Sequence, residues 1–387
     1  MYKELIEWQS EFTELRHDIH AHPEVGFDVV RTSKLVAELL KSWGYEVHTG
    51  IGKTGVVGQL KLGNSSRSIG LRADMDALPM QEKTGLPYSS QTPGSSHSCG
   101  HDGNTTMLLA GARLLAKRKD FDGTLNVIFQ PAEEGQGGGA AMVKDGLFDR
   151  FPCDYVFALH SIPNAEDNKV FYMQPGPMLA SSDRVMIVIN GRGGHGAEPQ
   201  NTIDPVVVGS AVVQALQSIV SRNVHQKERV VVTVASFIAG NENSFNIIPE
   251  TAKLLMSIRT MDNDVREMVI NNIKRIATDV CSAYGAKAEV IHTPIAGAVV
   301  NDPVAAKIAR TAALKVFPEA DCPETFQPYM NSEDFSYMLA ACPGAYGTFN
   351  NGNTPNCHQP DYDFNDELIN KGASYWTSLV ETYLQGE

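Results

Sequence analysis

The chain has 387 residues, 42% of them hydrophobic and 20% charged, which is the composition of an ordinary globular protein. Since a domain usually holds about 100–200 residues, we expect two domains. The formal net charge of −13 argues against a nucleic-acid partner, because phosphate binding needs clustered Lys and Arg. The charged N-terminus shows no secretory signal, and no apolar run approaches the ~20 residues that span a bilayer, so no membrane partner is expected.

The six cysteines are scattered along the chain rather than grouped. A disulfide-stabilised scaffold would show a dense set of cysteines in a much shorter sequence. The pattern therefore predicts reduced thiols and a cytoplasmic protein.

Helices and strands alternate in the first half of the chain. Amphipathic periodicity predicts helices over residues 2–20 and 31–43, the second ended by Gly44. Short apolar runs predict strands over 55–60, 68–76, 124–130 and 155–160, with a helix over 104–118. Apolar strands alternating with helices are typical of an α/β fold with a mixed, mostly parallel sheet that is flanked by helices.

The pattern changes near residue 184. The next segments read, in order, as strand 184–191, helix 204–222, strands 229–237 and 252–260, helix 263–283 and strand 286–292. This β-α-β-β-α-β order is that of a ferredoxin-like α+β domain. Because helix and strand patterns resume after Pro294, we expect an inserted domain over 184–293 within a discontinuous main domain of 1–183 and 294–387.

Three predicted strands of the first half lead into side chains that can bind metal ions. These side chains are Asp74 and Asp76 at the end of the first strand, Glu133 and Glu134 just after the second, and His160 at the end of the third. In open α/β sheets, sites lie at the carboxyl ends of the strands, so these residues should converge on one edge. Adjacent glutamates suit a metal hydrolase, because one carboxylate binds the ion while the other takes a proton from the attacking water.

A fourth polar segment, SHSCGHDGN at 96–104, precedes the predicted helix and contains Cys99 and His101. Thiolate and imidazole are ligands of zinc-like ions. The two residues are two positions apart, so in an extended loop their side chains can face the same way. His358, in a polar loop near the end of the chain, is a fifth candidate. Each residue alone is more often explained by packing or solvation, and only the common placement indicates a site.

The sequence also resembles a known family along nearly its whole length. The matching segments are RHDIHAHPEVGF (16–27), LRADMDALP (71–79), HSCGHDGN (97–104), FQPAEEG (129–135), ALHSIP (158–163), GRGGHGAEP (191–199), FNIIPE (245–250) and SEDF (332–335). They are similar to the M20 metallopeptidase family, and most to its branch of hippurate hydrolases, N-acyl-amino-acid deacylases and auxin-conjugate hydrolases. The resemblance implies a zinc-exopeptidase-like catalytic domain with an inserted lid or dimerisation domain.

The resemblance further implies a centre with two divalent ions, zinc or manganese, with cobalt or nickel also compatible. The implied ligands are Cys99, His101, Glu134, His160 and His358. Glu133 would be the general base that takes a proton from the attacking water and delivers it to the leaving amine. Asp76 would contact a metal ligand rather than the ion, and would fix the orientation and protonation state of that ligand. Asp74 stands where other branches carry a metal-binding histidine and is a second candidate.

The resemblance assigns roles to three residues of the inserted domain. His195 by itself reads as a turn histidine in a glycine-rich loop, but the resemblance implies that it stabilises the tetrahedral oxyanion, often from the partner subunit. Asn246 and Arg259 resemble the residues that hold the free carboxylate of the substrate. A homodimer joined through the inserted domain is therefore implied.

One position departs from the pattern of the branch, which usually reads His-Asp-x-His. Asn104 takes the place of the last histidine. Asparagine is a poor metal ligand, but it is a suitable N-cap for the helix predicted over 104–118. All five implied ligands remain, so metal binding is still predicted.

These observations favour a dinuclear-metal-dependent amidohydrolase that cleaves N-acyl amino acids, such as N-benzoylglycine, to a carboxylic acid and a free amino acid. Two other functions stay open. Asn104 would mark a catalytically silent protein that only binds metal or ligand. Cys99 with a histidine partner would make a thiol hydrolase, although that scheme leaves the Glu133–Glu134 pair without a role.

Overall fold

The computed structural model describes residues 2–165 and 169–385. The chain divides into two compact units. The first unit consists of Met1–Met178, Val300–Gln327 and Asp334–Glu387, and the second consists of Leu179–Val299 and Pro328–Glu333. The second unit is therefore an insertion in the first, and a short later segment returns to it.

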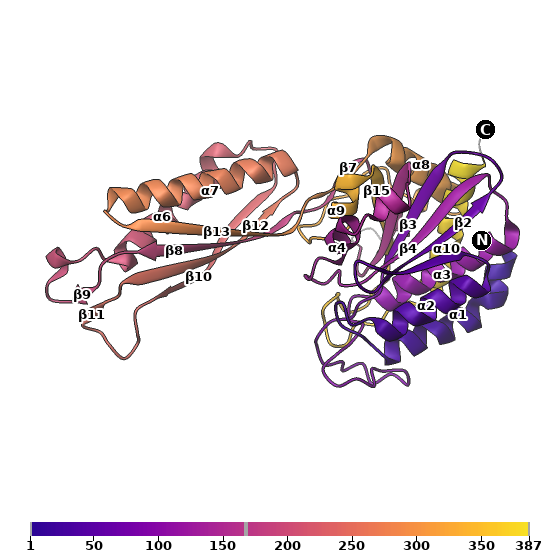
Figure 1. Ribbon diagram of the computed structural model, residues 1–387, viewed down its shortest axis with the longest axis horizontal. Coiled ribbons are helices and arrows are strands. Elements are labelled where there is room, and N and C mark those ends of the chain that lie inside the picture. The colour runs from indigo at the N-terminus through magenta and orange to yellow at the C-terminus, as the bar shows by residue number, and fades with distance from the viewer. Residues whose placement is uncertain (1, 166–168, 386–387) are drawn as a thin grey trace. The chain divides into compact units, whose positions relative to one another are not determined.

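The first unit is built on a seven-stranded sheet (Figure 1). In spatial order its strands are β1 (Glu46–Ile51), β2 (Gly55–Leu62), β4 (Gly123–Gln130), β3 (Ser68–Asp74), β5 (Tyr155–Ile162), β15 (Gly344–Asn350) and β6 (Phe171–Tyr172). The pairs β4–β3, β3–β5 and β5–β15 are parallel, whereas the pairs towards both edges are antiparallel. The predicted α/β fold with a mixed, mostly parallel sheet is confirmed.

Helices of the first unit cover this sheet because each has an apolar side. The long ones are α1 (Lys3–Ala21), α2 (Val30–Ser42), α3 (His101–Arg118), α8 (Pro303–Leu314) and α10 (Glu367–Leu384), and the short ones are α4 (Gly138–Lys144), α5 (Leu147–Arg150) and α9 (Ser336–Ala341). α3 and α10 both contact β3 and β4, α2 contacts β1 and β2, and α1 lies on α3 and α10. Figure 1 shows α4 and α9 on the other side of the sheet. The central strands are thereby buried on both faces, which explains their continuous apolar runs.

Helix α3 begins earlier than the sequence predicted. It starts at His101, after Gly100 takes a left-handed backbone conformation with φ of 85°. The N–H of Asn104 donates to the carbonyl of Gly100, one full turn inside the helix. The expectation that Asn104 is the N-cap of this helix is therefore wrong, because a left-handed glycine turns the chain into the helix three residues sooner.

The second unit contains a four-stranded antiparallel sheet and two helices. Its elements in chain order are β8 (Ser182–Asn190), α6 (Pro205–Ser218), β10 (Val230–Ala239), β12 (Thr251–Thr260), α7 (Asn263–Ala283) and β13 (Lys287–Ala296). The spatial order β10-β12-β8-β13 is that of a ferredoxin-like sandwich. Alternate residues such as Ile187 and Leu254 face α6 and α7 and form a separate core.

Several smaller elements complete the chain. They are β7 (Gly176–Leu179), β14 (Val299–Asn301), β9 (Gly194–His195), β11 (Ile247–Ile248), the 3-10 helices Pro199–Asn201 and Glu319–Asp321, and the short π-helix Ile219–Asn223 that follows α6. β7 pairs with β14, and β9 pairs with β11. Among the described residues, no helix is both long enough and apolar enough to cross a membrane. The six cysteines all lie in described segments as free thiols.

Candidate functional site

The carboxyl ends of three neighbouring strands lie at one edge of the first unit's sheet. β3 ends at Asp74, which is paired in parallel with Gln130 at the end of β4. β5 pairs with the other side of β3 and carries His160 near its own end. The structure thus brings together the strand ends that the sequence pointed to, as parallel pairing requires.

Six of the predicted site residues gather at this edge. They form three overlapping groups whose ligand atoms lie within 4.8 Å of one another, namely Cys99–His101–His160, Cys99–Glu134–His358 and His101–Glu133–Glu134. Cys99 belongs to the first two groups. The five predicted ligands and the predicted base therefore share one location.

Two buried histidines present the same ring atom to the centre. The Nδ1–H of His101 donates to the carbonyl of Asp76 over 2.8 Å, and that of His160 donates to the carbonyl of Ser161 over 2.7 Å. Because a carbonyl can only accept, Nδ1 carries a proton, and in the neutral ring the lone pair is then on Nε2. Nε2 of His101 is buried with no hydrogen-bond partner among the described residues, and Nε2 of His160 lies 3.6 Å from Cys99 Sγ. Both rings are oriented as metal-binding imidazoles are.

The carboxylate of Asp76 holds the turn that carries the two glutamates. Its oxygens accept the backbone N–H groups of Glu133 and Glu134 over 2.9 and 3.1 Å. Consecutive side chains leave the backbone in different directions, so this anchor points the two carboxylates at different places. Oε1 of Glu134 is buried and lies on the side of the centre that His358 approaches.

His358 reaches the centre from a strained turn. Its backbone φ is 66°, in the left-handed region that residues other than glycine rarely adopt. Its N–H donates to the carbonyl of Ser98 over 2.7 Å, which ties this turn to the loop that carries Cys99. Nε2 of His358 lies 3.2 Å from Glu134 Oε1, and this contact raises the pKa of His358. Such strain is concentrated at functional sites.

The electrostatics of the centre favour positive charge. Burial alone would lower the pKa of His101, but the nearby carboxylates of Asp74, Asp76 and Glu134 raise it well above its usual value. Several acidic groups in a buried place call for a cation, and a divalent ion supplies that charge. Together with Nε2 of His101, which is buried without a hydrogen-bond partner among the described residues, this donor set of thiol, imidazole and carboxylate fits ions of the zinc and manganese class.

A buried ion cluster supports the loop that carries the ligands. Asp102 is fully buried and accepts hydrogen bonds from Arg16 Nε over 2.7 Å and from His20 Nδ1 over 2.8 Å. The other ring nitrogen of His20 lies 3.4 Å from Glu82. Burial opposes the charge on His20, but Asp102 and Glu82 outweigh it and raise the pKa of His20 to about 9. Because Asp102 directly follows His101, the cluster fixes the start of α3.

Asn104 and Asp74 form a hydrogen-bonded pair next to the proposed ligand His101. Nδ2 of Asn104 donates to Asp74 Oδ1 over 2.9 Å, and Arg72 donates to Asp74 Oδ2 over 2.7 Å. That second oxygen lies 3.9 Å from Nε2 of His101. Burial would raise the pKa of Asp74, but His101 and Arg72 outweigh it and hold the pKa well below its usual range. Asn104 therefore contacts a carboxylate next to the centre and is not part of any of the three ligand groups.

The other three predicted residues belong to the second unit. His195 lies in β9 opposite Ile247 of β11, and the N–H of Gly196 donates to the carbonyl of Asn246, so the structure brings His195 and Asn246 together. Nδ1 of His195 accepts the N–H of Ala197 over 3.1 Å, which places the ring proton on Nε2. Arg259 lies in β12, and its buried NH1 nitrogen has no hydrogen-bond partner within residues 2–165 and 169–385.

Sequence reasoning missed several residues that support the centre. Arg16 and His20 lie in the segment RHDIHAHPEVGF, where buried charges on an amphipathic helix were the available signal. Cys357 forms a hydrogen bond with Cys99 that helps to raise the pKa of the Cys99 thiol, together with burial and the charge of Glu134. Its position next to His358 was the available signal.

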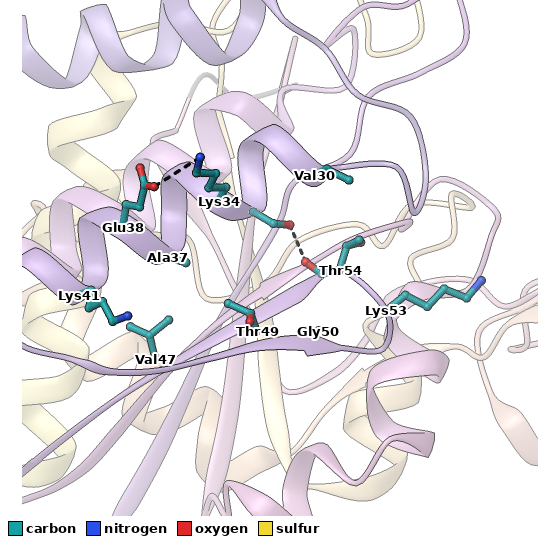
Figure 2. Close-up of a pocket in the computed structure, with 11 residues that line it drawn as sticks. Val30, Lys34, Ala37, Glu38, Lys41, Val47, Thr49, Gly50, Lys53 and Thr54 are labelled. Atoms are coloured by element: carbon teal, nitrogen blue, oxygen red, sulfur yellow. Dashed lines mark hydrogen bonds and ion pairs between the residues drawn. The ribbon is translucent and has the colours of Figure 1, made fainter.

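A separate groove lies between α2 and the hairpin of β1 and β2 (Figure 2). Its cavity volume is about 510 Å³, and Lys34, Lys41 and Lys53 line it together with aliphatic and hydroxyl side chains. Lys34 forms an ion pair with Glu38, one turn further along α2. The groove contains none of the predicted site residues, and its lining includes neither a histidine nor a cysteine, so we place the chemistry at the strand ends instead.

Comparisons with known proteins extend over the whole chain. The hippurate hydrolase of Campylobacter jejuni subsp. jejuni serotype O:2 is 46% identical over 382 residues, which cover 99% of each chain. The N-acetylcysteine deacetylase of Bacillus subtilis is 32% identical over 96% of each chain. The solved structure of Bacillus subtilis YXEP protein, described as a dinuclear metal binding peptidase from the M20 family, matches with a TM-score of 0.84 at 29% identity and covers 98% of this chain and 99% of that chain.

A family model agrees with these relatives. The model described as Peptidase family M20/M25/M40 matches residues 70–382, which include every predicted site residue. The match therefore covers both units and the strand-end centre as well as the inserted strands and helices. The chain belongs to peptidase family M20/M25/M40 and is a metal-dependent amidohydrolase.

Proposed function

We propose that the protein hydrolyses the amide bond of N-acyl amino acids, with N-benzoylglycine as its substrate, at a centre of two divalent ions. The observation that carries the proposal is the shared ligand Cys99, which belongs to one group with His101 and His160 and to another with Glu134 and His358. A shared ligand suits two neighbouring ions, and paired ions in hydrolases lie about 3.5–4 Å apart. The similarity to hippurate hydrolase supports this substrate, because hippurate is N-benzoylglycine.

In this proposal the ions are held by Cys99, His101, Glu134, His160 and His358. When bound, they polarise the amide carbonyl and bring the pKa of water towards ~7. Glu133 accepts a proton from the attacking water and delivers it to the amine nitrogen as the C–N bond breaks. Asp76 positions this step through the N–H of Glu133. Zinc or manganese are the proposed ions, with cobalt or nickel as substitutes.

The surroundings of Cys99 argue for a ligand rather than a nucleophile. A nucleophilic cysteine needs a lowered pKa so that the thiolate is present near neutral pH. The hydrogen bond with Cys357, burial and Glu134 instead raise the pKa of Cys99. A cation binding to the sulfur would remove its proton outright. Because the thiol-hydrolase scheme also leaves the Glu133–Glu134 pair without a role, we prefer the ligand role for Cys99.

For the second unit we propose substrate binding and dimerisation. His195 carries its ring proton on Nε2 and can donate it to an oxyanion. The NH1 nitrogen of Arg259 has no hydrogen-bond partner among the described residues, and with Asn246 it suits the free carboxylate of the substrate. The apolar side chains of Phe245 and Ile247 are exposed, and Ile247 is paired with His195 across β9 and β11. These exposed apolar side chains suit a homodimer interface. We propose a cytoplasmic location for the enzyme.

The experiment is an assay of free amino acid released from a panel of N-acyl amino acids by the zinc- or manganese-loaded protein. N-benzoylglycine, N-acetylglycine and N-acetylcysteine vary the acyl group and the amino acid separately. Release of glycine from N-benzoylglycine with the highest kcat/KM supports the proposal. Failure to hydrolyse any member of the panel would contradict it.

A further inference from the structure

One hydrogen bond links the proposed base to a residue about 200 positions further along the chain. The backbone N–H of Asp334 donates to Oε1 of Glu133 over 3.3 Å. We propose that Asp334 is a positioning residue that sets the orientation of the Glu133 carboxylate. This inference rests on the proposed function, in which Glu133 carries the proton.

The side chain of Asp334 is clamped by three elements of the first unit. Its carboxylate accepts Nε2 of Gln130 over 2.6 Å at the end of β4, NH2 of Arg72 over 3.4 Å from β3, and the N–H of Gly139 over 2.8 Å at the start of α4. Asp334 is 3% exposed, so these bonds form out of water, where they are strong. Arg72 also bonds to Gln130 and Asp74, which closes the network.

The residue at position 139 allows this clamp to form. A Cβ atom on Gly139 would lie 2.7 Å from the carbonyl oxygen of Asp334, closer than real contacts allow. Any side chain there would push the Asp334 backbone away and move the N–H that meets Glu133. Gly139 thus holds Asp334 in two ways, through its N–H on the carboxylate and through close packing against the backbone carbonyl.

The place of Asp334 in the chain explains why such an anchor matters. Residues 328–333 belong to the second unit, where Ala180 donates its N–H to the carbonyls of Tyr329 and Asn331, and Asp334 is the first residue back in the first unit. Without the clamp, any displacement of segment 328–333 would move the Asp334 N–H. The clamp therefore isolates the base from movement of that segment.

This geometry implies that Asp334 affects the rate of the reaction and not only the stability of the fold. If the Glu133 carboxylate can rotate freely, it is oriented towards the proton of the attacking water for a smaller fraction of the time. Misplacement of a reacting group by about 1 Å can lower a rate by about 100-fold. Loosening Asp334 should therefore lower kcat without removing substrate binding or metal ligands.

The test is a double-mutant cycle with N-benzoylglycine and metal-loaded protein, using Asp334→Asn, Glu133→Gln and the pair. Asp334→Asn keeps the shape but turns an acceptor into a donor facing other donors. We expect kcat to fall by about 10- to 100-fold, with KM within about 3-fold and the metal content per chain unchanged. In the Glu133→Gln background the same change should alter kcat by less than about 2-fold, because the residue acts through Glu133. Asp149→Asn, an exposed carboxylate in α5, is the matched control.

Three results overturn the inference: unchanged kcat in Asp334→Asn, an equal loss in both backgrounds, or a loss explained by missing metal. If Asp334→Asn does not fold, Gly139→Ala displaces the same backbone without altering a charge and is used in the same cycle. A wild-type protein that cleaves no N-acyl amino acid, or a Glu133→Gln variant as active as wild type, would instead contradict the proposed function. The two failures are therefore distinguishable.

Discussion

The Nδ1–H of His101 donates a 2.8 Å hydrogen bond to the backbone carbonyl of Asp76. This bond fixes the tautomer and the direction of the ring, so that Nε2 faces the centre. The carboxylate of the same aspartate holds the backbone of Glu133 and Glu134. One residue thereby orients an imidazole ligand, a carboxylate ligand and the proposed base, as supporting residues of metal sites commonly do.

Replacing Asp76 should disturb both metal binding and catalysis. In Asp76→Asn one acceptor becomes an N–H donor that faces the N–H of Glu133 or Glu134, so the turn must shift. We expect metal affinity and kcat each to fall by about 10- to 100-fold. Chelator competition gives the affinity, steady-state kinetics gives kcat, and Asp120→Asn on the surface is the control. Unchanged values in Asp76→Asn would show that the turn is held by other contacts.

Cys99 should be needed for metal content, because it belongs to two ligand groups. Serine is a poor ligand for zinc, so Cys99→Ser should retain less than about half of the wild-type metal. Cys153→Ser, which removes another half-buried thiol, should retain all of it. Metal analysis after dialysis measures both. Full metal content in Cys99→Ser combined with lost activity would instead favour a thiol nucleophile.

The Asp102 cluster should make stability depend on pH in alkaline solution. The folded protein raises the pKa of His20 from 6.5 to about 9, so it binds the protonated form more strongly than the unfolded chain does. This contribution is complete below pH 6.5 and is lost as the pH rises through about 9. The Tm difference between wild type and His20→Gln should therefore shrink by at least about 3 °C between pH 6 and pH 10, measured on metal-free protein. An equal difference at both pH values would contradict this account.

The second unit should mediate a homodimer. β10 is an edge strand of its sheet, and Ile238, Phe245 and Ile247 are 55%, 100% and 60% exposed. Free edges and clustered apolar side chains favour association with another chain. We expect light scattering to give a dimer for wild type and a monomer for Phe245→Asp at micromolar concentration. Val30→Asp, an equally apolar exposed site at 64% in the first unit, should remain a dimer. A monomeric wild type would contradict the proposal.

The sequence alone predicted the elements and the strand-end residues well, because both follow from local patterns. Continuous apolar runs located β3, β4 and β5, and parallel pairing then placed Asp76, Glu133 and His160 on one edge. The ferredoxin-like order of the second unit followed in the same way from helical and strand periods. These features need no knowledge of distant contacts.

The parts that could not be predicted depend on contacts between distant residues. Arg16 reaches Asp102 and Arg72 reaches Asp334 only after the sheet and its helices have assembled. The start of α3 was placed too late because the left-handed backbone of Gly100 depends on how the loop packs. Asn104 then looked like a cap, whereas it binds Asp74.

The most direct test of the account is metal content measured together with activity. We predict two divalent ions per chain in the active protein, loss of N-benzoylglycine hydrolysis when a chelator removes them, and recovery when zinc or manganese is returned. Recovery should be complete only near two equivalents, because Cys99 serves two ligand groups. Hydrolysis that persists in the metal-free protein would contradict the account.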